Sequence, residues 1–171
     1  MVDYQTISIV FTGLSISLAA FYYITTLRNA QRNQKQQLET RQAQLLMNIM
    51  NTFRSREFRK QWHTLFELET EGIESIYREY RSNLETITAW TSVLAFFDSI
   101  GVLVRYGMIE VGLIHSVMAS SVMALWETFG DFVLLDRKDV STYTLDSKPS
   151  RAWMDLEYLY QEIIEYNKTL N

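Results

Sequence analysis

Three charged side chains in apolar surroundings are the first candidates for chemistry in this chain. Asp98 interrupts a largely apolar run that extends from Ile87 to Val104. A carboxylate that is buried in such a run must find a partner or bind a proton. Arg105 lies two turns further along the same predicted helix, and Arg137 can reach Asp98 from another helix. We predict a buried ion pair among these three residues, with proton handling as the alternative role of Asp98.

Other candidates for catalysis or metal binding are few. The two histidines, His63 and His115, belong to no ExxH, HExxH or HxH arrangement that would place two ligands on one helix face. We interpret His63 as an exposed residue of an amphipathic helix and His115 as a hydrogen-bonded core residue. The chain has no cysteine and lacks the GxSxG, Walker and GxGxxG motifs. We therefore expect no catalytic residue, no metal and no cofactor, and we favour a protein without enzymatic activity.

The N-terminal segment has the composition of a membrane-spanning helix. From Tyr4 to Leu27 the chain carries no charge, and a helix of this length, about 36 Å, exceeds the roughly 30 Å hydrocarbon core of a bilayer. The residue ahead of the run is Asp3, whereas a cleaved signal peptide would have a basic segment there. We predict an uncleaved transmembrane anchor over residues 1–27, in preference to a buried core helix.

Positive charges beside the predicted anchor indicate its orientation. They follow the apolar run directly, at Arg28, Arg32, Lys35 and Arg41. Because Lys and Arg beside a membrane helix are retained on the cytoplasmic side, we expect the N-terminus outside and the rest of the chain in the cytoplasm. The sequence thus predicts a single-pass protein of the inner or plasma membrane, with the lipid bilayer as its first partner.

One face of the predicted anchor carries small or polar side chains at steps of three, four or seven residues. We call it the association stripe, and it consists of Gln5, Ser8, Thr12, Ser15, Ala19 and Thr26. Small and hydroxyl residues let membrane helices pack closely, so the stripe favours contact with another copy or with another membrane subunit. Two alternatives remain: the hydroxyls bond to carbonyls of their own helix, or the stripe lines a pore.

The residues after the anchor divide into a polar and an apolar part. Residues 28–44 are rich in helix-forming polar residues and predict a helical stalk. Residues 45–171 have several apolar helical patterns and predict a small helical bundle. The single proline and six glycines leave few turn signals for strands, so we predict an all-α fold. The net charge of −4 gives no support for a nucleic-acid surface.

Several helix boundaries of the bundle can be placed from its residues. Ser55 is the expected N-cap of a helix with an aromatic face, and a short helical piece is expected from Ile73 to Tyr80. The segment 84–105 is apolar around most of its circumference and predicts the central helix, ended by Gly107. A helix from about residue 110 is expected to bend near 119–121, and a last helix follows with Trp153, Leu156, Leu159, Tyr160 and Ile163 on one face.

Two of these segments also raise a rival topology with further membrane spans. They are the apolar stretches at residues 86–104 and 111–126. The first contains Asp98, whose insertion costs about 3 kcal/mol, and the second is only about sixteen residues long and contains His115. Buried helices of a bundle explain both stretches better than additional membrane spans.

Several short motifs of the chain carry a resemblance to known sequences: Phe96-Phe97-Asp98-Ser99-Ile100-Gly101-Val102-Leu103, Gly107 to Ile109, Trp126-Glu127, Arg137 and Leu156-Glu157-Tyr158-Leu159. Together they resemble an uncharacterised prokaryotic family of small proteins with an N-terminal membrane helix and a helical domain of unknown function. The resemblance implies the anchored architecture, and it implies no activity. We therefore expect a membrane-anchored interaction module, either a homo-oligomer or an accessory subunit of a larger membrane complex. A membrane-bound enzyme or a small pore-forming protein is the alternative.

Overall fold

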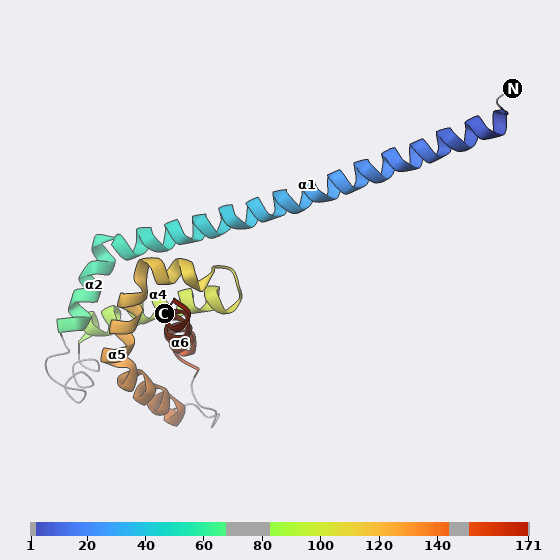
Figure 1. The fold of residues 1–171 in the computed structure, drawn as a ribbon. Coiled ribbons are helices and arrows are strands. Elements are labelled where there is room, and N and C mark those ends of the chain that lie inside the picture. The colour runs from blue at the N-terminus through green and yellow to red at the C-terminus, as the bar shows by residue number, and fades with distance from the viewer. Residues whose placement is uncertain (1–2, 68–82, 144–150, 171) are drawn as a thin grey trace. The chain divides into compact units, whose positions relative to one another are not determined.

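The computed structural model of the chain describes residues 3–67, 83–143 and 151–170, and these ranges contain five helices and no strand. The prediction of an all-α fold is confirmed. The predicted short helix at 73–80 lies outside the described residues. The helices are α1 (Tyr4–Arg54), α2 (Arg56–Glu67), α4 (Leu84–Arg105), α5 (Val111–Tyr143) and α6 (Met154–Leu170), as Figure 1 shows.

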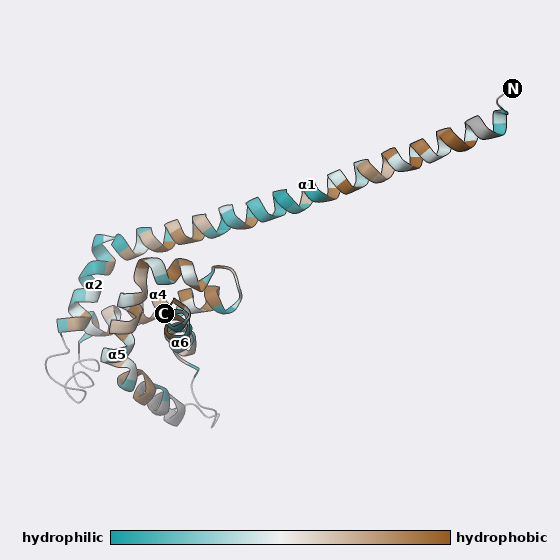
Figure 2. Cartoon of the chain, viewed as in Figure 1, coloured by the Kyte–Doolittle hydropathy of each residue, from teal (hydrophilic) through white to brown (hydrophobic). Residues whose placement is uncertain are grey.

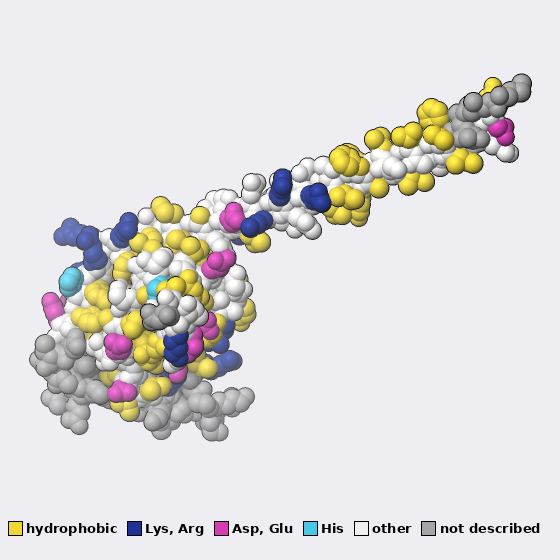
Figure 3. Space-filling model, viewed as in Figure 1, with side chains coloured by type: hydrophobic (Ala, Val, Ile, Leu, Met, Phe, Trp, Pro, Cys, Tyr) yellow, Lys and Arg dark blue, Asp and Glu magenta, His cyan; other side chains and the backbone are white. Residues whose placement is uncertain are grey.

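The chain divides into two compact units, Met1–Ala43 and Gln44–Asn171. In the first unit, every described side chain from Asp3 to Arg41 is exposed. Apolar side chains dominate the N-terminal half of α1, and hydrophilic ones follow them over the predicted stalk (Figures 2 and 3). The boundaries that we predicted at residues 27/28 and 44/45 remain predictions, because α1 is continuous through both.

Three described helices are long and apolar enough to cross a membrane by length and composition. They differ in how much of their apolar window, the stretch of 18 residues with high mean hydropathy, is already buried within the chain. The share is 0% for Ser8–Arg54, 44% for Leu84–Arg105 and 39% for Val111–Leu135. The first helix therefore differs from the other two in having none of its apolar window covered by the rest of the chain.

Helix α4 is the centre of the second unit. It packs against α2 and α6, and one side of it is buried through Trp90, Val93, Leu94, Phe97 and Ile100. Its bounds match the predicted segment 84–105. The helix begins at Asn83, whose side chain accepts a hydrogen bond from the backbone N–H of Glu85 at 2.9 Å. The central position predicted from the apolar circumference is thus confirmed.

The end of α4 follows from one glycine. Gly107 has a φ of +64°, a left-handed conformation that costs glycine little. Its N–H bonds to the carbonyl of Val104 at 3.0 Å, and the N–H of Met108 bonds to that of Leu103 at 2.9 Å. These two bonds form a Schellman motif, which satisfies the last carbonyls of the helix. The predicted role of Gly107 as the residue that ends the helix is confirmed.

Helix α2 turns an aromatic face toward α4. Ser55 caps the helix, because its hydroxyl oxygen accepts a hydrogen bond from the N–H of Phe58 at 3.1 Å, as predicted. The ring of Phe58 lies 4.6 Å from that of Phe96, and the ring of Trp62 lies 5.8 Å from that of Phe97. This packing leaves the opposite side of α2 exposed.

Helix α5 bends at Met118, where the backbone leaves helical geometry (φ −150°, ψ 17°). The bend was predicted near 119–121, so it lies one residue earlier. Helix α5 packs against α6, which buries Leu156, Leu159 and Ile163 of the predicted face.

Candidate functional site

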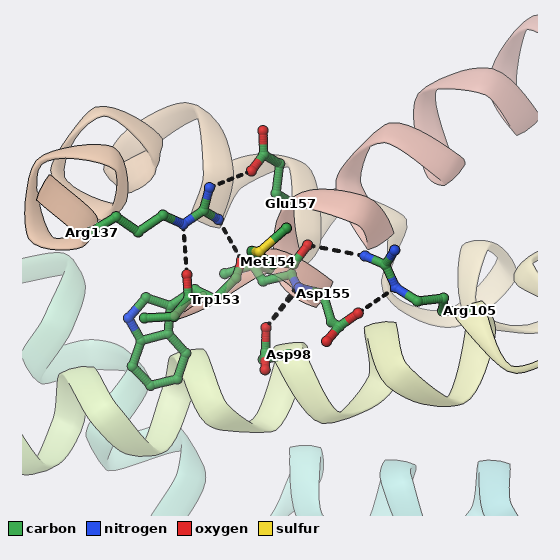
Figure 4. A network of polar contacts seen from close by, with 9 residues as sticks. Asp98, Arg105, Arg137, Trp153, Met154, Asp155 and Glu157 are labelled. Carbon is green, nitrogen blue, oxygen red and sulfur yellow. Dashed lines mark hydrogen bonds and ion pairs between the residues drawn. The ribbon is translucent and has the colours of Figure 1, made fainter. Parts of the chain in front are cut away.

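A polar network surrounds the N-terminus of α6 and contains the three charged residues that the sequence selected (Figure 4). The chain enters α6 through Trp153, a non-glycine residue in the left-handed region with a φ of 58°. Such a conformation costs about 1 kcal/mol or more, so surrounding contacts must stabilise it.

Asp98 of α4 caps α6 from outside. Its Oδ1 accepts hydrogen bonds from the backbone N–H groups of Asp155 and Leu156, both at 3.0 Å. The first N–H groups of a helix have no partner within it, and the helix dipole favours negative charge there. The half-buried carboxylate of Asp98 therefore does for α6 what a local N-cap side chain does for most helices.

Arg137 of α5 holds the turn that precedes α6. Its Nε donates to the carbonyl of Ala152 at 2.6 Å and its Nη2 to that of Trp153 at 2.9 Å. Its Nη1 pairs with Glu157 at 2.6 Å. Because the guanidinium is planar and its side chain is only 15% exposed, these contacts fix the strained turn against α5.

Arg105 at the end of α4 makes the third contact with α6. Its Nε pairs with Asp155 at 2.5 Å, and its guanidinium lies 4.2 Å from the centre of the Tyr158 ring. Burial, followed by a hydrogen bond with Glu162, raises the pKa of the Tyr158 hydroxyl above its usual range, against a smaller opposite effect of Arg105. The phenol, which is neutral at neutral pH, packs against the guanidinium through the face of its ring.

Gly101 allows α4 to approach the start of α6 this closely. A Cβ atom built at this position would fall on the backbone carbonyl of Asp155, far inside van der Waals contact. Without the glycine, Asp98 could not lie within hydrogen-bond distance of the helix end.

The structure thus brings Asp98, Arg105 and Arg137 to one helix end, but neither arginine is the ion-pair partner of Asp98. Each arginine has its own carboxylate, and Asp98 accepts backbone hydrogen bonds. The sequence did not indicate these partners, because acidic residues such as Asp155 and Glu157 are common in the first turn of any helix. The network is a structural junction whose polar groups bond to one another.

The two histidines lie apart from this network. His63 is exposed, and His115 is half-buried with its Nε2 2.7 Å from the side-chain oxygen of Asn167. In the part of the chain that the structure describes, no group of three His, Cys, Asp or Glu side chains is placed to hold a metal ion.

Two open grooves mark the surface of the domain. One, of about 430 Å³, lies between α2 and α4 and includes the ion pair of Lys60 and Glu85, whose atoms are 2.8 Å apart. The other, of about 400 Å³, is lined by the α4–α5 turn and by Tyr158, Glu162 and Tyr166. None of their lining residues is Asp98, Arg105 or Arg137.

All residues of the association stripe are exposed in the chain. The hydroxyls of Thr12, Ser15 and Thr26 each donate to the carbonyl four residues earlier, at 2.8, 2.8 and 2.9 Å. Hydrogen bonds within the same helix, the first alternative, are therefore present. The property of the stripe that would favour contact with another helix is therefore mainly the small size of its side chains.

Comparison with known proteins places the chain in one family. The model of the family described as "Domain of unknown function (DUF4760)" matches residues 8–163, and the chain belongs to this family. No curated protein and no solved structure matches the chain. The predicted resemblance to a family of unknown function is confirmed, and it includes both the N-terminal helix and the domain.

Proposed function

We propose that this member of the DUF4760 family is a membrane-anchored helical interaction module. Helix α1 crosses the inner or plasma membrane once, near its N-terminal end, with the N-terminus outside. The domain Gln44–Asn171 is held in the cytoplasm, and its partner is a second copy of the chain or a subunit of a larger membrane complex.

The observation that carries the proposal is the exposure of the apolar window of α1. Large apolar side chains from Ile9 to Leu27 are between 45% and 74% exposed, among them Phe11 and Leu18. Leaving such side chains in water costs roughly 1.5–3 kcal/mol each, which a soluble chain does not sustain over some twenty residues. A lipid environment removes this cost.

The apolar character of the other two helices is explained by the core of the domain. Helices α4 and α5 contribute Trp90, Phe97, Phe129 and Phe132 to one core, where all four are buried. Exposing these faces to lipid would require the core to open. A single span is therefore the simplest topology.

Fractionation of a truncated chain tests the single span. A fragment that begins near Gln37 should be soluble without detergent and strongly helical by circular dichroism. The full chain should require detergent for extraction. A fragment that stays in the membrane fraction would instead favour the rival topology with further spans.

Protease protection tests the orientation. In right-side-out membranes, added protease should spare a tag attached after Asn171, because the basic residues after Leu27 are retained in the cytoplasm. A tag attached before Met1 should be removed. The opposite pattern would show that the domain lies outside.

The association stripe supplies a test of the partner. Leucine at Ser8, Thr12 and Ser15 together removes the small face, whereas alanine at the same positions keeps it small and removes only the hydroxyls. The hydroxyls of Thr12 and Ser15 already donate hydrogen bonds within α1, so we expect the alanine variant to associate like the wild type. We expect the leucine variant to lose association, because its bulky side chains hold the helices apart. Crosslinking in membranes measures both. Equal crosslinking in all three proteins would show that the stripe makes no contact with a partner.

A further inference from the structure

A concentrated basic surface lies on the exposed side of α2, at the corner where α1 ends. It consists of Arg54, Arg56, Arg59, Lys60 and His63, all exposed. We call these residues the basic corner. Positions 56, 59, 60 and 63 follow a spacing of three, four and seven residues, which places them on one face of a helix. Figure 3 shows the corresponding blue side chains and a histidine gathered at one edge of the domain.

The charge of this surface is opposite to that of the domain that carries it. Residues 44–171 contain 12 Lys and Arg against 18 Asp and Glu, a net charge of −6. Four of those 12 cations fall within residues 54–60, with Glu57 as the only acidic residue among them. A local positive surface on a negative domain attracts an anionic ligand at one place and repels it elsewhere.

The arginines of the corner are not used by the fold. Lys60 pairs with Glu85, which lowers the pKa of that carboxyl and raises the pKa of Lys60. Within the described part of the chain, no carboxylate lies within ion-pair distance of Arg54, Arg56 or Arg59. Arg105 and Arg137 of the same domain, in contrast, each hold a carboxylate of α6. Three guanidinium groups with five donors each are therefore available to a ligand.

The surroundings of the basic corner favour a polypeptide segment over a membrane surface as the ligand. The lining of the adjoining groove between α2 and α4 includes the uncharged residues Thr64, Thr88 and Leu84, with the side chain of Leu84 76% exposed, and also the carboxylates of Glu57 and Glu85. A membrane surface is flat, and it would bring its negative charge within about 8 Å of Glu57 and Glu85 as well, where screening is incomplete. A single polypeptide segment can turn its carboxylates toward the arginines and an apolar side chain toward Leu84, so that no carboxylate of the segment needs to face Glu57 or Glu85.

We infer that the basic corner of α2 is a docking site for an acidic polypeptide segment of a partner protein. The carboxylates of the segment pair with Arg54, Arg56 and Arg59, and the groove beside Leu84 takes an apolar side chain next to them. Arginine suits this role because its planar fork binds a carboxylate through two parallel hydrogen bonds. The inference concerns the domain alone and does not depend on how α1 is anchored.

Binding of a labelled acidic peptide to the full chain tests the inference. The chain is kept in uncharged detergent, the probe is a fluorescent ten-residue glutamate peptide with one leucine, and anisotropy measures its affinity. Replacing Arg54, Arg56 and Arg59 with glutamine should weaken binding about ten-fold, since each exposed charged contact changes the affinity about two-fold. The matched control replaces three arginines of the stalk, Arg28, Arg32 and Arg41, and should leave the affinity unchanged.

Three further comparisons separate the alternatives. Lysine at the three corner positions keeps the charge and removes the fork, so we expect an intermediate affinity. Raising the salt concentration should weaken binding to the wild type more than to the glutamine variant. Equal loss of affinity in the corner and stalk variants would overturn the inference, because it would show attraction by overall charge. It would also be overturned if vesicles of anionic phospholipid bound through the corner while the peptide did not.

Discussion

Removing the carboxylate of Asp98 is the most direct perturbation of the junction between α4 and α6. In an Asp98→Ala variant, the N–H groups of Asp155 and Leu156 lose their acceptor, to which both are bonded at 3.0 Å. Loss of an N-cap costs about 0.5–2 kcal/mol, and a hydrogen bond to a charged group contributes about 1.5–3 kcal/mol. Because Asp98 is half-buried and water can reach part of the site, we expect a loss of about 2 kcal/mol.

Tryptophan fluorescence provides a suitable assay in the full chain. All four tryptophans, Trp62, Trp90, Trp126 and Trp153, lie in the domain, so α1 contributes no tryptophan fluorescence. In urea, a slope of about 2 kcal/mol/M converts the expected loss to a midpoint shift of about 1 M. The measurement is made in uncharged detergent at neutral pH.

Two companion variants make the result specific. Asp98→Asn keeps an acceptor oxygen and loses the charge at the helix end, so its loss should be only about 0.3–1 kcal/mol. Asp131→Ala removes an exposed carboxylate of α5 and should change stability by less than about 0.5 kcal/mol. If Asp98→Ala and Asp131→Ala had equal midpoints, the cap from α4 would not stabilise α6 and the reasoning would be refuted.

Three further predictions concern the same domain and use the same urea midpoint. Gly101→Ala should lower the free energy of unfolding by about 3 kcal/mol, because the added Cβ atom meets the backbone of Asp155. Gly112→Ala should lower it by less than about 1 kcal/mol, because the added atom meets only the end of the Tyr166 side chain. Equal losses of stability in the two variants would contradict this. Arg137→Met removes three hydrogen bonds to the start of α6 and should cost about 2 kcal/mol, and an unchanged midpoint would contradict its role. The lowered pKa of Glu85 means that its contribution is present above the usual range of a glutamate and is lost as the pH falls through the lowered value. Because both side chains of that pair are more than 60% exposed, this contribution is small. Glu85→Gln should therefore shift the urea midpoint at pH 7 by no more than the measurement error, and a clear decrease there would contradict this.

The helices of the domain could be predicted from the sequence where a local signal determines them. The bounds 84–105, the cap at Ser55 and the end at Gly107 each depend on residues within a few positions of the boundary. The bend of α5 was misplaced by one residue, because no proline or glycine pair fixes it at Met118.

The contacts of the candidate site could be predicted only in part. An acid in an apolar helix indicates that Asp98 has a polar partner, but the partner is a helix end 57 residues away in the sequence. Trp153 has no side chain that can cap α6, and no local pattern shows that a residue of α4 does so instead. The pairing of Arg105 with Asp155 and of Arg137 with Glu157 likewise depends on the packing of α4, α5 and α6 and on no spacing within one helix.

Several residues that carry the family resemblance lie in this junction. Asp98 and Gly101 of the first motif contact the start of α6, and Gly107 ends the helix that holds them. Arg137 and Glu157, from two other motifs, form an ion pair with each other. A motif made of such residues specifies how three helices meet, and it does not require a shared substrate. Function of this chain is then expected on surfaces outside the motifs, such as the basic corner of α2 and the association stripe of α1.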